Sequence, residues 1–81
     1  MSPQKDFVPE ESEMKLKNNL KVWRAKRDIT QADLAKSIGL SRQTINSIEK
    51  GKFIPSVLSA MKISFFFETS IEEIFFIEEE K

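Results

Sequence analysis

Residues 30–52 form the stretch that most constrains the fold, because they predict two short helices joined by a tight turn. Thr30 is a good N-cap for the first helix, and Asp33 stands where a capping-box acid reaches back to the Thr30 amide. Gly39 follows that helix, where the chain needs a left-handed backbone, and Ser41 can cap the second helix. The apolar residues of the two helices recur at helical spacing. They are Leu34, Ala35, Ile38, Ile45 and Ile48.

The chain has 81 residues, enough for one small domain, and it contains no Cys, no His and no Tyr. It therefore cannot form disulfides or thiolate metal sites, and it lacks the commonest general base. Carboxylates are present, but no catalytic partner for them is evident, so we expect neither an enzyme, a metal nor a cofactor. No apolar run approaches the ~18 residues of a membrane-spanning helix, and the N-terminus has no signal-peptide core. We expect a soluble protein with no membrane partner.

The formal net charge is zero, yet the charges are segregated along the chain. Residues 14–67 carry eleven basic and three acidic side chains, whereas residues 1–13 and 68–81 are acidic on balance. A basic body attracts phosphate, and a helix-turn-helix pattern places its second helix in a DNA major groove. A well-solvated helix surface with acidic ends is the alternative interpretation. The charge and the two-helix pattern together predict a nucleic-acid partner.

Composition and periodicity divide the chain into three segments. Residues 1–14 contain prolines and acids with no periodic apolar face, so we expect a flexible acidic arm. Residues 15–77 hold the helical patterns and form the domain, and residues 78–81 are an acidic tail. The periodicity predicts an all-α fold of five helices. Besides the two central helices, these are expected over 15–27, over 57–67 and from Ile71 onward.

Phenylalanines are concentrated near the C-terminus, and three of them are consecutive at positions 65–67. Successive side chains on a helix turn by about 100°, so these three cannot all face one core. An apolar surplus of this kind usually marks an interface. A tightly packed monomer core is the alternative. We expect a homodimer interface that contains Phe65, Phe66, Phe76 and Ile77.

From about Leu20 to Phe75 the sequence resembles the Cro/repressor-type helix-turn-helix domains, also called the Xre family. The matching motifs occur in the family's order: Arg24, T-Q-x-x-L-A at 30–35, I-G-L-S-R-Q-T-I at 38–45, I-E-K-G-K at 48–52, Pro55, and S-I-E-E-I-F at 70–75. The resemblance implies a lambda-repressor-like five-helix bundle with its third helix, about 42–50, in the major groove. Glu68 departs from the pattern, because the family usually has glycine there, at the end of the fourth helix.

The resemblance also implies roles for residues around that third helix. Base contacts are implied for Arg42, Gln43, Thr44, Asn46 and Ser47. Phosphate contacts are implied for Gln31, Ser41, Lys50 and Lys52. A partly buried ion pair between Arg24 and Glu49 is implied to orient the helix. The chemistry agrees independently, because Arg pairs with guanine O6 and N7, and Gln pairs with adenine N6 and N7.

We therefore expect a sequence-specific regulator of transcription, a repressor that binds a palindromic double-stranded DNA operator as a homodimer. The resemblance implies a cytoplasmic protein of a bacterium, an archaeon or a phage. The alternative is an antitoxin or antirepressor-type interaction module. Such a module would bind a small protein partner through the Phe-rich C-terminal surface.

Overall fold

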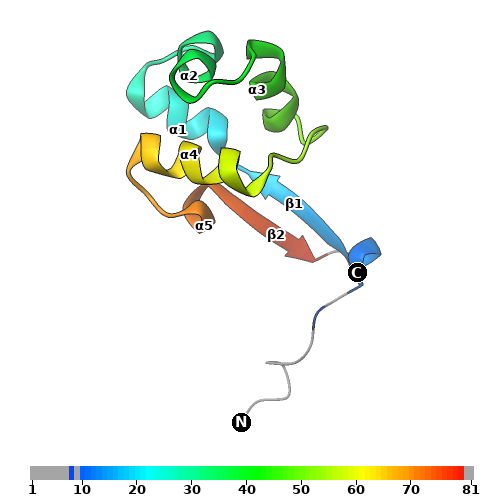
Figure 1. Cartoon of the computed structure of the whole chain (residues 1–81). Coiled ribbons are helices and arrows are strands. Elements are labelled where there is room, and N and C mark those ends of the chain that lie inside the picture. The colour runs from blue at the N-terminus through cyan, green and yellow to red at the C-terminus, as the bar shows by residue number, and fades with distance from the viewer. Residues whose placement is uncertain (1–7, 9, 80–81) are drawn as a thin grey trace.

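The computed structural model of the protein describes residue 8 and residues 10–79. A small body of helices carries a two-stranded antiparallel sheet that extends away from it (Figure 1). The helices are α1 (Leu20–Arg27), α2 (Gln31–Ile38), α3 (Arg42–Glu49), α4 (Val57–Phe67) and α5 (Ile71–Ile74). The strands are β1 (Met14–Asn18), which follows the short 3-10 helix η2 (Glu11–Glu13), and β2 (Phe75–Glu79). Among the described residues, no helix has the length and hydropathy needed to cross a membrane.

The predicted caps of the central two-helix unit are confirmed. The Thr30 hydroxyl accepts from the Asp33 amide at 3.0 Å, and the Asp33 carboxylate accepts from the Thr30 amide at 3.0 Å, a complete capping box. Gly39 ends α2 in the left-handed conformation with φ 76°. Ser41 caps α3 by accepting from the Thr44 amide at 3.0 Å. Local chemistry therefore determines both helix starts and the turn between them.

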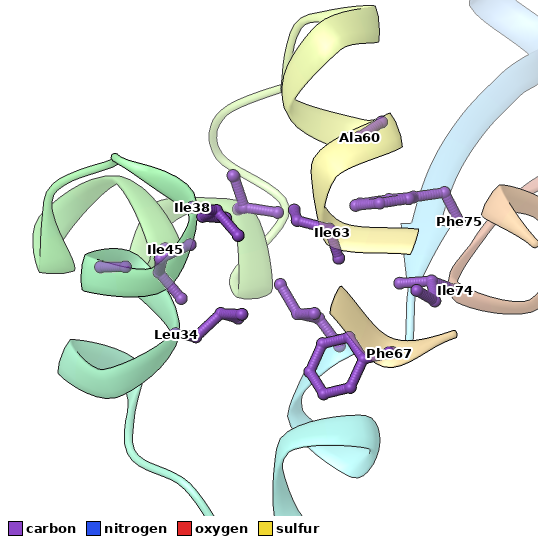
Figure 2. Close-up of a cluster of buried hydrophobic side chains, with 11 residues drawn as sticks. Leu34, Ile38, Ile45, Ala60, Ile63, Phe67, Ile74 and Phe75 are labelled. Atoms are coloured by element: carbon purple, nitrogen blue, oxygen red, sulfur yellow. The ribbon is translucent and has the colours of Figure 1, made fainter. Parts of the chain in front are cut away.

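One hydrophobic core joins the helices and the start of β2 (Figure 2). Side chains from α2 and α3 face those from α4, α5 and β2 across a shared interior, and burying each of the larger ones contributes ~1.5–3 kcal/mol. Trp23 and Phe66 are only partly buried against this interior. The buried hydrophobic residues are Leu20, Leu34, Ala35, Ile38, Ile45, Ile48, Ala60, Ile63, Phe67, Ile74 and Phe75.

The expectation of an all-α fold is wrong in one respect, because both ends of the domain are strands. Residues 15–18, expected as the start of the first helix, belong to β1, and Phe76 and Ile77 belong to β2. The β1 sequence M-K-L-K-N alternates apolar and polar residues with period two, which favours a strand. Asn19, the N-cap residue of α1, then separates the strand from the helix.

The two strands complement each other in charge. β1 contributes lysines and β2 contributes glutamates, and Lys17 Nζ lies 3.9 Å from Glu78 Oε1. Leu16 is opposite Ile77 at the centre of the ladder, and Met14 is opposite Glu79 at its end. The strands thus extend across the expected limits of the 15–77 domain. The division into arm, domain and tail stays a prediction, and residues 1–7, 9 and 80–81 lie outside the described residues.

Two helices end on an acidic residue in the left-handed conformation. Asp28 closes α1 with φ 55°, and Glu68 closes α4 with φ 56°. At the end of α4, the Glu68 amide donates to Phe65 O at 3.1 Å and the Thr69 amide donates to Ser64 O at 3.0 Å. The helix therefore ends with left-handed geometry, although glycine is absent. A side chain in this conformation costs roughly 1 kcal/mol.

We expect Glu68→Gly to raise the free energy of unfolding by about 0.5–1 kcal/mol, because glycine removes the backbone strain at a small entropic cost. Urea denaturation measures the change. Gly39→Ala is the matched control and should lower stability by about 1 kcal/mol. A Cβ at Gly39 would meet no atom within 4 Å, so its cost comes from the backbone alone. A loss of stability in Glu68→Gly would contradict this explanation.

Candidate nucleic-acid interface

α3 turns an apolar side to the core and a polar side to solvent. Ile45 and Ile48 are 0% and 1% exposed. Among the described residues, the side chains of Arg42 and Gln43 make no hydrogen bond or ion pair. The five side chains expected to contact bases are Arg42 and Gln43, which are exposed, and Thr44, Asn46 and Ser47, which are half-buried.

The start of α3 is held by its own cap. The Ser41 hydroxyl, expected to contact phosphate, accepts from the Thr44 amide, and the Ser41 and Thr44 hydroxyl oxygens lie 2.8 Å apart. One of the two hydroxyls donates to the other, so the second hydroxyl proton remains available to an acceptor outside the chain. The first turn of α3 thus presents two long side chains, Arg42 and Gln43, that are unpaired among the described residues, on a helix start held by the Ser41 cap.

Arg24 of α1 and Glu49 of α3 form a two-pronged ion pair. Arg24 Nε donates to Glu49 Oε2 at 2.6 Å, and Arg24 Nη2 donates to Glu49 Oε1 at 3.0 Å. The side chains are only 13% and 7% exposed. The hydrogen bonds to Glu49 raise the pKa of Arg24 against the opposing effect of burial, so the guanidinium stays charged. Arg24 Nη1 also donates to Ile29 O at 3.0 Å, which ties the α1–α2 connection to the pair.

Gln31, at the first position of α2, connects the ion pair to α3. Its Nε2 donates to Asn46 Oδ1 and to Glu49 Oε1, both at 3.1 Å. These bonds occupy Nε2 of the Gln31 side chain and Oδ1 of Asn46. Both residues were expected to contact DNA. The backbone amide of Gln31 remains at the N-terminus of α2, where helices favour an anion. Gln31 and Asn46 therefore help to hold α2 and α3 together.

Asn18, which the sequence reasoning missed, also supports the C-terminal end of α3. Its Nδ2 donates to Ile48 O at 2.9 Å, and its Oδ1 accepts from the Leu20 amide at 3.1 Å. One side chain thus binds a carbonyl in the last turn of α3 and an amide at the start of α1. The signal in the sequence is the Asn18–Asn19 pair between a strand pattern and a helix, since such residues favour caps and turns.

Lys50 and Lys52 follow α3 on either side of Gly51 and are exposed. Gly51 has φ 74°, which turns the chain away from the helix axis. The Lys50 amide donates to Asn46 O at 3.1 Å and the Lys52 amide donates to Ser47 O at 2.9 Å. The backbone of both lysines is anchored, and their side chains extend into solvent beyond the end of α3.

The structure does not bring the four expected interface residues onto one surface. Phe66 is half-buried, with its ring edge-on against Phe67 at a centroid distance of 4.9 Å. Phe65 is 77% exposed and lines a hollow between α2 and α4. Phe76 and Ile77 are successive residues of β2 and point to opposite faces of the sheet.

A broader apolar surface, of which the sequence reasoning named only Ile77, surrounds the connection between α3 and α4. Leu16, Phe53 and Ile54 line one small hollow there, and Leu16 pairs with Ile77 across the sheet. We call this set the apolar surface. It comprises Leu16 and Ile77 of the sheet, Phe53 and Ile54 of the connection, and Val57 and Leu58 of α4, with exposed fractions from 36% to 75%.

The described residues contain no group of three acidic side chains that could hold a metal ion, and the chain has no His or Cys. The exposed polar chemistry around α3 is instead that of hydrogen-bond donors and cations. These groups suit the base edges and phosphates of nucleic acid.

Comparison with known proteins gives a consistent result across most of the domain. A family model described as helix-turn-helix matches residues 20–74. An HTH-type transcriptional regulator of Methanocaldococcus jannaschii is 53% identical over 66 residues, which cover 82% of this chain and 100% of that relative. An HTH-type transcriptional regulator of Bacillus subtilis is 42% identical over 65 residues, which cover 80% of this chain and 98% of that relative.

Solved structures show the same arrangement of helices. The SOS-response transcriptional repressor LexA from Eubacterium rectale aligns with a TM-score of 0.64 and 36% identity, over 68% of this chain and 58% of that chain. The transcriptional regulator VanUg aligns with a TM-score of 0.72 over 91% of this chain and 99% of that chain. Its identity is 17%, so that likeness is one of fold.

We expect Glu49→Ala to lower the free energy of unfolding by about 3 kcal/mol, because it leaves the Arg24 charge and the Gln31 amide without their acceptor in a largely buried place. Urea denaturation measures the loss. Glu78→Ala breaks the exposed pair with Lys17 and should cost less than about 1 kcal/mol. Equal costs for the two variants would contradict a structural role for the Arg24–Glu49 pair.

Proposed function

Because this chain belongs to the Xre-type helix-turn-helix family of DNA-binding transcriptional regulators, we propose that it recognises a specific double-stranded DNA operator with α3 and represses transcription there. One observation carries the proposal: the first turn of α3 presents Arg42 and Gln43 unpaired among the described residues, on a helix braced by the Arg24–Glu49 pair. Repression follows from occupancy, since a protein bound in the major groove of promoter DNA excludes others from it.

Base recognition is assigned to the side chains that α3 leaves available. Arg42 matches the O6 and N7 acceptors of guanine, and Gln43 matches adenine N6 and N7. Thr44 and Ser47 suit closer contacts with base edges or a thymine methyl group. Each good bidentate contact contributes ~1–3 kcal/mol of discrimination. Asn46 is assigned to positioning α3 against α2, because its side-chain oxygen already accepts a hydrogen bond from Gln31.

Phosphate contacts position the helix in the groove. The backbone amide of Gln31 at the N-terminus of α2 and the Ser41 hydroxyl suit phosphates on one side of the groove. Lys50 and Lys52 are assigned to the backbone beyond the end of α3. Their attraction to phosphate is electrostatic, so it adds affinity without sequence preference.

We further propose that two copies bind together through the apolar surface. A twofold interface places the same patch of both copies against itself, and this patch is uncharged and apolar, so it suits its own copy. It surrounds the α3–α4 connection, so pairing there would set the two α3 helices side by side on a palindromic operator. Ile77, Leu58 and Ile54 are central to this proposal, and Phe65 is not.

A protein-interaction role of the antitoxin or antirepressor type is the second candidate. The observation in its favour is Phe65, which is 77% exposed beside Lys62 and Lys36 in a hollow of about 650 Å³ between α2 and α4. This hollow suits an acidic segment with apolar side chains from a small partner protein. A DNA-binding assay with the purified chain alone distinguishes the two candidate functions, because DNA recognition needs no partner protein.

We expect Arg42→Ala and Gln43→Ala to change base preference, each losing about 1–3 kcal/mol of discrimination at one position. Lys50→Ala and Lys52→Ala should instead weaken binding to all sequences and flatten the dependence of log affinity on log salt by about 0.9 per phosphate. Fluorescence anisotropy on an operator and its single-base variants, over a range of salt, measures both effects.

Lys62→Ala is the matched control for the lysine variants, since Lys62 is an exposed lysine on α4 that lines the hollow beside α2. It should leave base preference and salt dependence unchanged. The site assignment fails if the four variants above bind like the wild type.

We expect Ile54→Glu to convert the dimer to a monomer, because it places two charges in the centre of a twofold apolar interface. Ile54 is 70% exposed, so the fold should tolerate the change. Sedimentation equilibrium at micromolar concentration measures the mass. Phe65→Glu, a change at a similarly exposed residue outside the apolar surface, should remain a dimer. A wild-type monomer, with or without DNA, would refute the interface.

A further inference from the structure

A hollow of about 270 Å³ lies between β1 and the end of α3. Its polar lining is mostly basic, and it includes backbone atoms around Gly51 as well as side chains. β1, which forms one wall of the hollow, runs between the helical body and the outer end of the sheet (Figure 1). The polar and charged residues that line the hollow are Lys15, Lys17 and Asn18 from β1, and Glu49 and Lys50 from the end of α3.

Among the described residues, Glu49 is the one acid in this lining, and its charge is already neutralised. Both oxygens of Glu49 accept hydrogen bonds from Arg24, and one accepts from Gln31 as well. The Glu49 side chain is 7% exposed, so it offers little negative charge to a ligand in the hollow. The lysine charges therefore determine the local potential, which favours an anion.

Lys17 lies beside an acidic residue of the second strand, Glu78 on β2. The pair is long, at 3.9 Å, and its side chains are 43% and 59% exposed. Water screens such a pair, so it exchanges readily for another anion. Lys50 follows α3 directly and is exposed on the opposite wall of the hollow. Two lysines from different elements thus line one hollow.

We propose that this hollow holds a backbone phosphate of the DNA that flanks the segment recognised by α3, with Lys17 and Lys50 as its cationic ligands. The inference rests on the proposed function, because it needs α3 on DNA. Lys50 already lies beyond the end of α3, and β1 continues outward from that point, so β1 would follow the phosphate backbone past the major-groove contacts. Lys17 then exchanges Glu78 for phosphate, which a lysine can approach from many directions.

The exchange makes opposite predictions for the two partners of the Lys17–Glu78 pair. Lys17→Gln should weaken binding to a long operator duplex and reduce the magnitude of the salt slope by about 0.9, the value for one phosphate. Glu78→Gln should strengthen binding, because it removes the anion that competes for Lys17. Both side chains are exposed on the sheet, so neither change should unfold the chain, and thermal melting checks this.

The length of the DNA gives an independent readout. Wild-type protein should bind more weakly to a duplex that ends at the segment recognised by α3 than to one extended by half a helical turn on each side. Lys17→Gln should show less of this difference, because the substitution removes the lysine that binds the flanking phosphate. Lys62→Gln, on α4 beside α2, is the charge-matched control and should keep both the salt slope and the length dependence of the wild type.

The outcomes distinguish this inference from the function on which it rests. If the wild type binds its operator specifically and Lys17→Gln matches Lys62→Gln in salt slope and length dependence, the phosphate site in the hollow is refuted and α3 recognition stands. If the wild type shows no sequence preference, both the phosphate site in the hollow and DNA recognition by α3 are refuted. A weaker slope for Lys17→Gln together with tighter binding by Glu78→Gln supports the site.

Discussion

The ion pair between Arg24 and Glu49 is the interaction on which the orientation of α3 depends. It joins the first helix of the bundle to the end of α3 with two short hydrogen bonds in a largely buried place. Gln31 adds a third element by donating to Glu49 and to Asn46. A shift of α3 would leave one of these charges or amides unpaired away from water, which is costly. The pair therefore fixes the orientation of α3 relative to the other helices of the bundle.

The hydrophobic core and the polar network act on different sides of the same helix. Ile45 and Ile48 hold α3 against the interior, but apolar contacts are non-directional and would tolerate some rotation. The directional bonds of Glu49 and Asn46 remove that freedom. Asn18 extends the restraint to the sheet by binding Ile48 O. Side chains in the first turn of α3 are left for an external partner, which is how a scaffold of this size can present a binding site.

Local patterns predicted the central unit well, because its caps and its glycine turn are settled within a few residues. The capping box of Thr30 and the left-handed Gly39 need no distant contact. The strands were missed because β1 acquires its conformation from β2, which follows it by more than fifty residues, and five residues of alternation are a short signal. The bonds from the Gln31 side chain to Asn46 and Glu49 were not predicted, because these residues become neighbours only after folding. Most of the apolar surface was missed, in α4 because that helix is apolar on most sides and gives no clear periodicity.

We propose that α3 recognises a specific DNA sequence from two symmetrically placed copies of the chain. Selection of bound duplexes from a random pool, with the purified chain alone, tests this proposal. We expect an enriched palindrome whose half-sites are centred about one helical turn apart, ~34 Å, with guanine or adenine strongly preferred at the positions facing the start of α3. A pool that remains random after selection, or one enriched in a single unpaired half-site, would contradict it.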